Sequence, residues 1–251
     1  MLIVCLVRRE IKWWGYKNAL LLLVCGFFFG LDLIFYHYSI HWVGPGLGTI
    51  LPNFQVFILA AAGVIVFKER LRPVYIMSIP LAFGGMFLIV GFQWRYLGYT
   101  YQFGVILGLA AAICYAAFLL SLRKLQAELT GESRYYVLMM VSLITALFLA
   151  GELVRTGDGF RIPDIQSLGA LLALGLGSQV IGWLLITNAL PSVRASLSGL
   201  ILLLQPAGAF IWDVVLFQRP TTVINWLGVV LALGAIYLGT LHSNRPAKAG
   251  K

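Results

Sequence analysis

Eight long apolar segments follow one another along this chain, and they limit its possible folds more than any other feature of the sequence. Each is about as long as the roughly 20 apolar residues that a helix needs to cross the hydrocarbon core of a bilayer. Apolar residues make up 61% of the chain, against roughly 45–50% in a soluble domain. The sequence therefore predicts an all-α, polytopic membrane helix bundle with eight transmembrane helices, at about 18–41, 43–67, 74–93, 104–122, 135–154, 167–189, 192–217 and 223–242.

Two parts of the chain are similar to each other. Residues 39–91 align without gaps on residues 189–241, with nine identities that include Gln55 on Gln205, and the helix ends coincide as well. We interpret this as an internal repeat of five helices, and an odd number of helices gives the two units opposite membrane orientations. The same offset predicts a truncated first repeat at 1–93, with three helices and a remnant at Met1–Val7, and a complete second repeat at 104–242.

The excess of basic residues predicts the orientation of the chain. A net charge of +9 would suggest a nucleic-acid partner for a soluble protein, but in a membrane protein basic residues gather in cytoplasmic loops. With the N-terminal basic segment inside, fourteen basic residues fall on the inner side and four on the outer side. We therefore expect both ends of this chain in the cytoplasm, with a disordered tail at 243–251 and no partnership with nucleic acid.

Two segments carry a family resemblance. Gly44–Pro73 reads GPGLGTILPNFQVFILAAAGVIVFKERLRP and is followed by a Gly84-Gly85 pair in the next helix, and Gly199–Phe217 reads GLILLLQPAGAFIWDVVLF. These segments resemble the two EamA repeats of the drug/metabolite transporter superfamily. The resemblance implies inverted five-helix repeats that exchange small metabolites across a bacterial inner membrane, with the path between the halves. It also implies that this chain lacks the first family helix and most of the second.

Amide side chains near the middle of the predicted spans are candidates for a substrate path. Gln55 and Gln205 lie at the centres of 43–67 and 192–217, where an unpaired amide costs several kcal/mol. Each is next to or near a helix-breaking proline, and Asn53 adds another amide. We assign Asn53, Gln55, Gln179 and Gln205 to the path. The alternative is that these amides join neighbouring helices, typically worth about 0.6 kcal/mol each.

Asp32 is the candidate for proton coupling or for holding a cationic substrate, and His37 lies nearer the outer end of the same helix. A carboxylate near the centre of a span costs roughly 2.5–3.5 kcal/mol on insertion scales, so it faces an aqueous cavity or a partner. Desolvation favours its neutral form, which could carry a proton. The alternative is a static pair with a polar group of a neighbouring helix. Asp213 lies close to the outer interface, where water hydrates it.

Other functions find less support in the sequence. His37 and His41 have a spacing that can bind zinc, but no third ligand or HExxH glutamate accompanies them, and the three cysteines form no CxxC pair. No serine follows the pattern of an activated nucleophile. We expect no enzymatic activity, no cofactor and no metal site. The expected function is secondary transport of small organic metabolites, amino-acid-like compounds or drugs, with lipid and a possible homodimer as partners; the alternative is a non-transporting membrane scaffold, helix-assembly subunit or inactive fragment.

Overall fold

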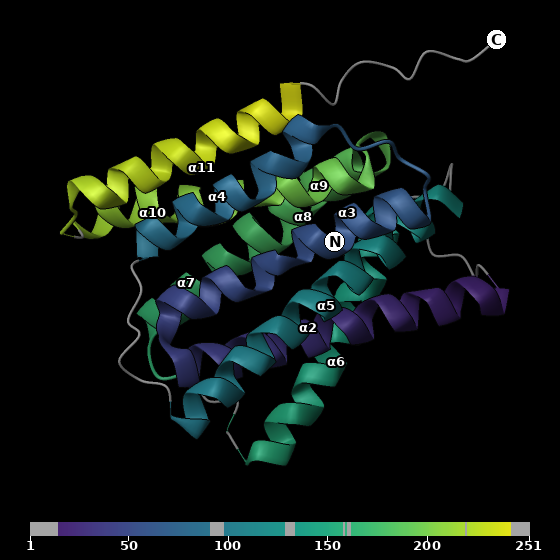
Figure 1. Cartoon of the computed structure of the whole chain (residues 1–251). Coiled ribbons are helices and arrows are strands. Elements are labelled where there is room, and N and C mark those ends of the chain that lie inside the picture. The colour runs from purple at the N-terminus through teal and green to yellow at the C-terminus, as the bar shows by residue number, and fades with distance from the viewer. Residues whose placement is uncertain are drawn as a thin grey trace, which may run out of the picture. The chain divides into compact units, whose positions relative to one another are not determined.

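The computed structural model describes residues 15–90, 98–128, 134–157, 159, 162–218 and 220–241. The regular elements among them are all helical (Figure 1). Seven helices of this part are long and apolar enough to cross a membrane, and Pro73–Ile89 is a shorter apolar helix. The predicted polytopic helix bundle is confirmed. The elements are α2 (Gly15–Ile50), η1 (Leu51–Phe54), α3 (Gln55–Ile65), α4 (Pro73–Val90), α5 (Tyr99–Glu128), α6 (Arg134–Thr156), α7 (Ile165–Ala173), η2 (Leu174–Gly182), α8 (Trp183–Ala189), η3 (Leu190–Ser192), α9 (Ala195–Leu202), α10 (Leu204–Phe217) and α11 (Val223–Leu241).

The long element α2 contains the first predicted span and the start of the second. Gly44 interrupts it with φ 82° and ψ 162°, a backbone conformation that glycine reaches without the clash of a side chain. The spans on its two sides are Gly15–Gly44 and Leu47–Ile65. The chain doubles back closely, because a Cβ atom on Gly48 would lie 3.0 Å from the Cα atom of Ile40. The predicted boundary between 18–41 and 43–67 falls at this turn.

The chain folds into two compact units, each built from segments that are distant in the sequence. Among the described residues, unit 1 comprises 15–34 and 117–193, and unit 2 comprises 35–116 and 194–241. The two units are defined by spatial contact and not by similarity between segments, so the internal repeat stays a prediction. The proposed remnant at Met1–Val7 and the tail at 243–251 lie outside the described residues.

Unit 2 is built on helix pairs that approach each other closely. α4 and α11 lie side by side along their lengths (Figure 1), and Gly85 faces the backbone of Gly228 and Ala232. α3 packs on α9, where a Cβ atom on Gly199 would be 3.0 Å from the Cα atom of Val56. The buried apolar side chains of this unit form one continuous core, made of Ile50, Val56, Ala60, Tyr75, Ile79, Ala82, Phe83, Met86, Leu200, Leu203, Ala235 and Ile236.

Unit 1 combines the first part of α2 with the end of α5 and with α6, α7, η2 and α8. α2 packs on α6 through Gly26, whose carbonyl oxygen accepts a hydrogen bond from Thr145 Oγ1 at 3.0 Å. The predicted helix at 167–189 is divided here, because η2 is a π-helix between α7 and α8. A π-helical segment has wider turns than an α-helix and is common at functional sites.

Candidate functional site

The candidate site contains a stripe of buried side chains on one face of α2. Leu22, Cys25, Phe29 and Asp32 recur at intervals of three and four residues, so they share one face of the helix. All four side chains are buried, with relative exposures of 6%, 0%, 9% and 7%. Three members of the stripe are the apolar residues that such a face requires. Asp32 is the exception, because a carboxylate occupies a position that packing alone would fill with an apolar side chain.

An aromatic cluster lies one turn before Asp32. Phe29 stacks on Phe118 of α5, with ring centroids 4.4 Å apart and an angle of 16° between the planes. Trp183 of α8 meets both rings edge-on, at centroid distances of 5.2 Å from Phe29 and 5.1 Å from Phe118. We call Phe29, Phe118 and Trp183 the aromatic triad. All three side chains are buried, and Phe29 lies one turn before Asp32 on the same face of α2.

The directions of α2 and α6 follow from two contacts. Ile144 lies against Gly26, and Phe148 lies against Gly30. From the first contact to the second, the residue number increases by four on α2 and by four on α6. The two helices therefore run parallel. Five residues, 129–133, connect α5 to α6, and five residues are too short to return the chain along a membrane span. α5 therefore runs antiparallel to α6 and to α2.

The direction of α8 follows in the same way. Phe118 and Trp183 are in contact, and further along both segments Arg123 Nη1 donates a hydrogen bond to the carbonyl oxygen of Val193. α5 and α8 thus run parallel, and α8 is antiparallel to α2. The direction from Phe29 to Asp32 on α2 is therefore the direction from Trp183 towards lower residue numbers, which belong to the π-helix η2.

The part of η2 that precedes Trp183 is mostly apolar, and its polar side chains are Ser178 and Gln179. Both lie about one turn before Trp183, and both are exposed. Cβ atoms built on Gly175 and Gly177 would meet no other atom within 4 Å. The sequence assigned Gln179 to a substrate path; the helix directions put it at about the level of Asp32, and its place on a path stays a prediction.

The Asp32 carboxylate lacks a partner in the part of the chain that the structure describes, where no hydrogen bond or ion pair reaches it. Its side chain is 7% exposed, and its oxygens are not among the fully enclosed polar atoms without partners. The carboxylate therefore still touches accessible space. By contrast, the Thr187 hydroxyl of α8 is fully enclosed and has no hydrogen-bond partner among the described residues.

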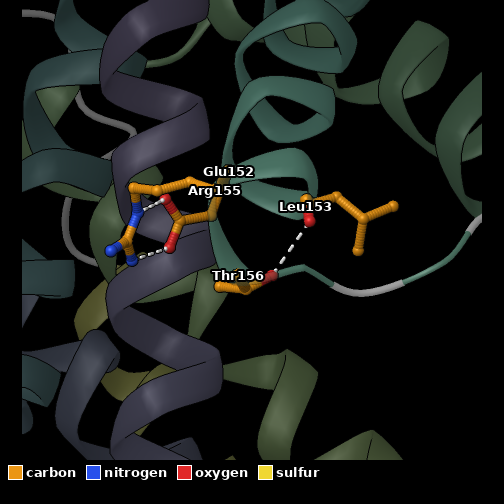
Figure 2. A network of polar contacts seen from close by, with 4 residues as sticks. All are labelled: Glu152, Leu153, Arg155 and Thr156. Atoms are coloured by element: carbon orange, nitrogen blue, oxygen red, sulfur yellow. Dashed lines mark hydrogen bonds and ion pairs between the residues drawn. The ribbon is translucent and has the colours of Figure 1, made fainter.

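The basic side chains of unit 1 that the structure describes lie at helix ends, away from Asp32. Arg155 binds Glu152 through two hydrogen bonds of 2.7 and 2.6 Å (Figure 2), and Lys124 lies 3.8 Å from Glu128. Lys17 precedes Asp32 by fifteen residues, about 22 Å along a helix. None of these cations is placed to neutralise Asp32.

The predicted path residues of unit 2 lie in different environments. Asn53 is buried and donates a hydrogen bond to the Thr49 carbonyl oxygen at 2.7 Å. Gln55 is 1% exposed, and its Oε1 atom has no partner among the described residues. Gln205 is exposed at the start of α10. The structure shows no hydrogen bond between the two described glutamines, so their sharing of one cavity stays a prediction.

Two predicted candidates lie elsewhere or outside the described side chains. His37 belongs to unit 2, is exposed, and packs edge-on against the Tyr36 ring at 5.4 Å. The side chain of Asp213 is outside the described part. Among the described residues, His, Cys, Asp and Glu form no group of three that could hold a metal ion.

Sequence reasoning missed a carboxylate contact in unit 2. Glu69 follows α3 and accepts hydrogen bonds from the backbone nitrogens of Ala195 and Ser196, at 2.9 and 3.3 Å. Ser196 Oγ donates another at 2.5 Å, and the Tyr75 hydroxyl donates to the Ser196 carbonyl oxygen at 2.6 Å. Glu69 thus caps the first turn of α9 from 126 residues away. Only its position after an apolar helix was visible in the sequence.

Unit 1 also contains an apolar groove beside the stripe. It lies between α2 and α6, has a volume of about 580 Å³, and is lined by Leu23, Val24, Phe27, Ile144, Leu147 and Phe148. Its walls carry no charged side chain, and it is open on one side. A groove of this kind suits a lipid chain better than a polar molecule, so we do not include it in the candidate site.

Comparison with known proteins assigns the chain to a family. The model of the EamA-like transporter family matches residues 102–241, more than half of the chain, and the protein belongs to this family. No curated protein sequence matches significantly. A solved structure, titled only "Crystal structure of protein", matches with a TM-score of 0.79 and 16% identity over 96% of this chain and 83% of that chain. At this identity the match supports the fold alone.

Proposed function

We propose that this protein is a secondary transporter that moves small organic molecules across a bacterial inner membrane by alternating access, as an exporter or exchanger. The substrate classes we propose are metabolites, amino-acid-like compounds and drugs. The observation that carries the proposal is Asp32: a member of a transporter family buries a carboxylate inside an apolar span and gives it no described partner. A carboxylate in that position costs several kcal/mol, and binding a substrate or a proton during transport offsets this cost.

The competing function, a non-transporting membrane scaffold, leaves that carboxylate unexplained. Helix assembly uses small residues and apolar contacts, as in the Gly26 contact with Ile144. An unpaired Asp32 would only weaken such an assembly. The family match also favours transport over catalysis.

Reconstitution tests the proposal directly. Proteoliposomes that contain the purified chain are loaded with a mixture of unlabelled amino acids, amines and sugars. Exchange of this mixture against labelled members of each class is then measured. We expect exchange of at least one class, and a strong loss of that exchange in Asp32→Asn. The matched control is Asp164→Asn, which changes an exposed carboxylate of the same unit. Exchange equal to that of empty liposomes for every class would contradict transport by this chain.

The orientation is proposed from the distribution of basic residues. Residues 66–72 follow α3, and Lys68, Arg70 and Arg72 in this segment are exposed. We propose that this segment and both ends of the chain face the cytoplasm. Single cysteines at Lys68 and Arg72 should resist a membrane-impermeant maleimide in intact cells and react after permeabilisation. Labelling of these positions in intact cells would reverse the orientation.

A further inference from the structure

We propose that Asp32 and the aromatic triad form a binding site for the ammonium group of small organic amines that carry an apolar or aromatic body. The inference rests on the proposed transport function for its role, but the binding itself can be measured without transport. Three features of unit 1 carry it: a buried carboxylate without a described partner, the aromatic rings one turn away from it, and the position of the basic side chains.

The carboxylate selects the charge of the ligand. Among the described cations of unit 1, Arg155 pairs with Glu152 (Figure 2), Lys124 pairs with Glu128, and Arg123 donates a hydrogen bond to the carbonyl oxygen of Val193. The ionised form of Asp32 would repel an anion, and its protonated form would offer an anion no opposite charge; a neutral molecule gains no charge attraction from either form. A ligand that brings its own positive charge forms a charge-assisted hydrogen bond in a medium of low dielectric.

The aromatic triad distinguishes an organic cation from a proton. Phe29 is on the same face as Asp32 and one turn away, and Trp183 meets the rings of both Phe29 and Phe118 edge-on. Aromatic rings attract ammonium groups and pack against apolar bodies. A residue that only carries a proton gains nothing from such rings. The arrangement therefore favours a ligand with a charged end at Asp32 and an apolar part along the triad.

The experiment compares molecules of equal shape and different charge. 2-Phenylethylamine is a cation at neutral pH, 2-phenylethanol is its neutral counterpart, and phenylacetate is an anion. Binding of each to the purified full chain in a non-ionic detergent is measured by equilibrium dialysis. We expect the amine to bind at least about tenfold more tightly than the alcohol, the gain of one charge-assisted hydrogen bond, and we expect no binding of phenylacetate.

Variants locate the site. Asp32→Asn should weaken amine binding at least about tenfold and leave the weak binding of the alcohol unchanged, whereas Asp164→Asn should bind as the unchanged protein does. Trp183→Phe should weaken binding of 2-phenylethylamine roughly two- to fivefold, and the effect on methylammonium should be smaller. If Asp32→Asn does not fold, the charge comparison on the unchanged protein and the Trp183→Phe comparison still decide the matter.

The outcomes separate this inference from the proposed function. Equal binding of amine and alcohol, or unchanged amine binding by folded Asp32→Asn, overturns the amine site. Absence of binding for a series of amines from methylammonium to 2-phenylethylamine at millimolar concentration overturns it as well. Charge-selective binding without exchange in proteoliposomes supports the site and contradicts transport. Exchange of other substrates without amine binding supports transport and contradicts the site.

Discussion

The two units of this protein differ in what holds them together. In unit 2, helices meet backbone to backbone, as where Gly85 faces Gly228 and Ala232. In unit 1, the contacts around the site run through large side chains such as the aromatic triad, and the π-helix η2 has open glycines. Close backbone contact leaves little freedom for rearrangement, whereas side chains can repack. We infer that unit 2 is the more rigid of the two, and that unit 1, which holds the proposed binding site, can repack more easily.

The largest expected effect comes from disrupting the closest helix contact of unit 2. A Cβ atom on Gly85 would lie 2.6 Å from backbone atoms of Gly228 and Ala232, which cannot rotate away. Gly85→Ala should therefore force α4 and α11 apart and cost about 3 kcal/mol, the upper part of the usual range for overpacking. The measurement is the thermal unfolding of the purified protein in detergent.

The neighbouring glycine provides the control. At Gly84 the nearest atom to an added Cβ would be a side-chain carbon of Leu231 at 4.0 Å, which is ordinary contact. Gly84→Ala should leave the unfolding temperature within about 2 °C of the parent. Similar unfolding temperatures for Gly84→Ala and Gly85→Ala would show that α4 and α11 are not tightly joined, and the contrast between the units would lose its main support.

A smaller loss is expected from the cap of α9. Glu69→Ala removes the acceptor for the backbone nitrogens of Ala195 and Ser196 and for the Ser196 hydroxyl. Loss of such a cap typically costs about 1–2 kcal/mol. Glu69→Gln keeps one carbonyl acceptor and should recover part of the loss. Hydrogen exchange of the first turn of α9 checks this, and unchanged protection in Glu69→Ala would contradict the capping role.

The glycines of η2 should respond in the opposite direction to those of unit 2. Gly177→Ala meets open space and should stabilise the protein by about 0.4–1 kcal/mol, because alanine restricts the unfolded chain. Gly199→Ala in unit 2 meets the Val56 backbone at 3.0 Å and should destabilise it. Thermal unfolding compares the two. A destabilising Gly177→Ala would mean that η2 is as tightly constrained as unit 2.

The smallest effect concerns the start of α7. Asp164 accepts a hydrogen bond from the Ser167 backbone nitrogen at 2.7 Å, and this bond holds the pKa of the Asp164 carboxyl below its usual value. A lowered pKa stabilises the helix start at neutral pH, and the contribution is lost as the pH falls through the lowered pKa. Asp164→Asn caps without titrating. The protection factors in the first turn of α7, which are corrected for the intrinsic exchange rate, should therefore fall more steeply in the parent than in Asp164→Asn as the pH drops from about 5 to 3, as an order-of-magnitude window; parallel curves would contradict the titrating cap.

The fold was predictable from the sequence to the extent that it depends on local hydrophobicity. The length of each apolar run predicts each span, and a charge inside such a run identified Asp32 without any structure. The division into two units was not predictable, because one apolar helix face fits many others. The aromatic triad could not be predicted either, because the chain has 16 phenylalanines and 7 tryptophans and many pairings among them are possible. The Glu69 contact with Ser196 was hidden because it joins residues that are far apart in the sequence.

The turn at Gly44 has a consequence for how the protein enters the membrane. Only residues 45 and 46 separate the spans Gly15–Gly44 and Leu47–Ile65, so no hydrophilic loop between them has to be translocated. We therefore expect the two spans to enter the lipid together, as one helical hairpin. A polar insertion after Gly44 should therefore disturb biogenesis itself, before any question of folding or transport arises.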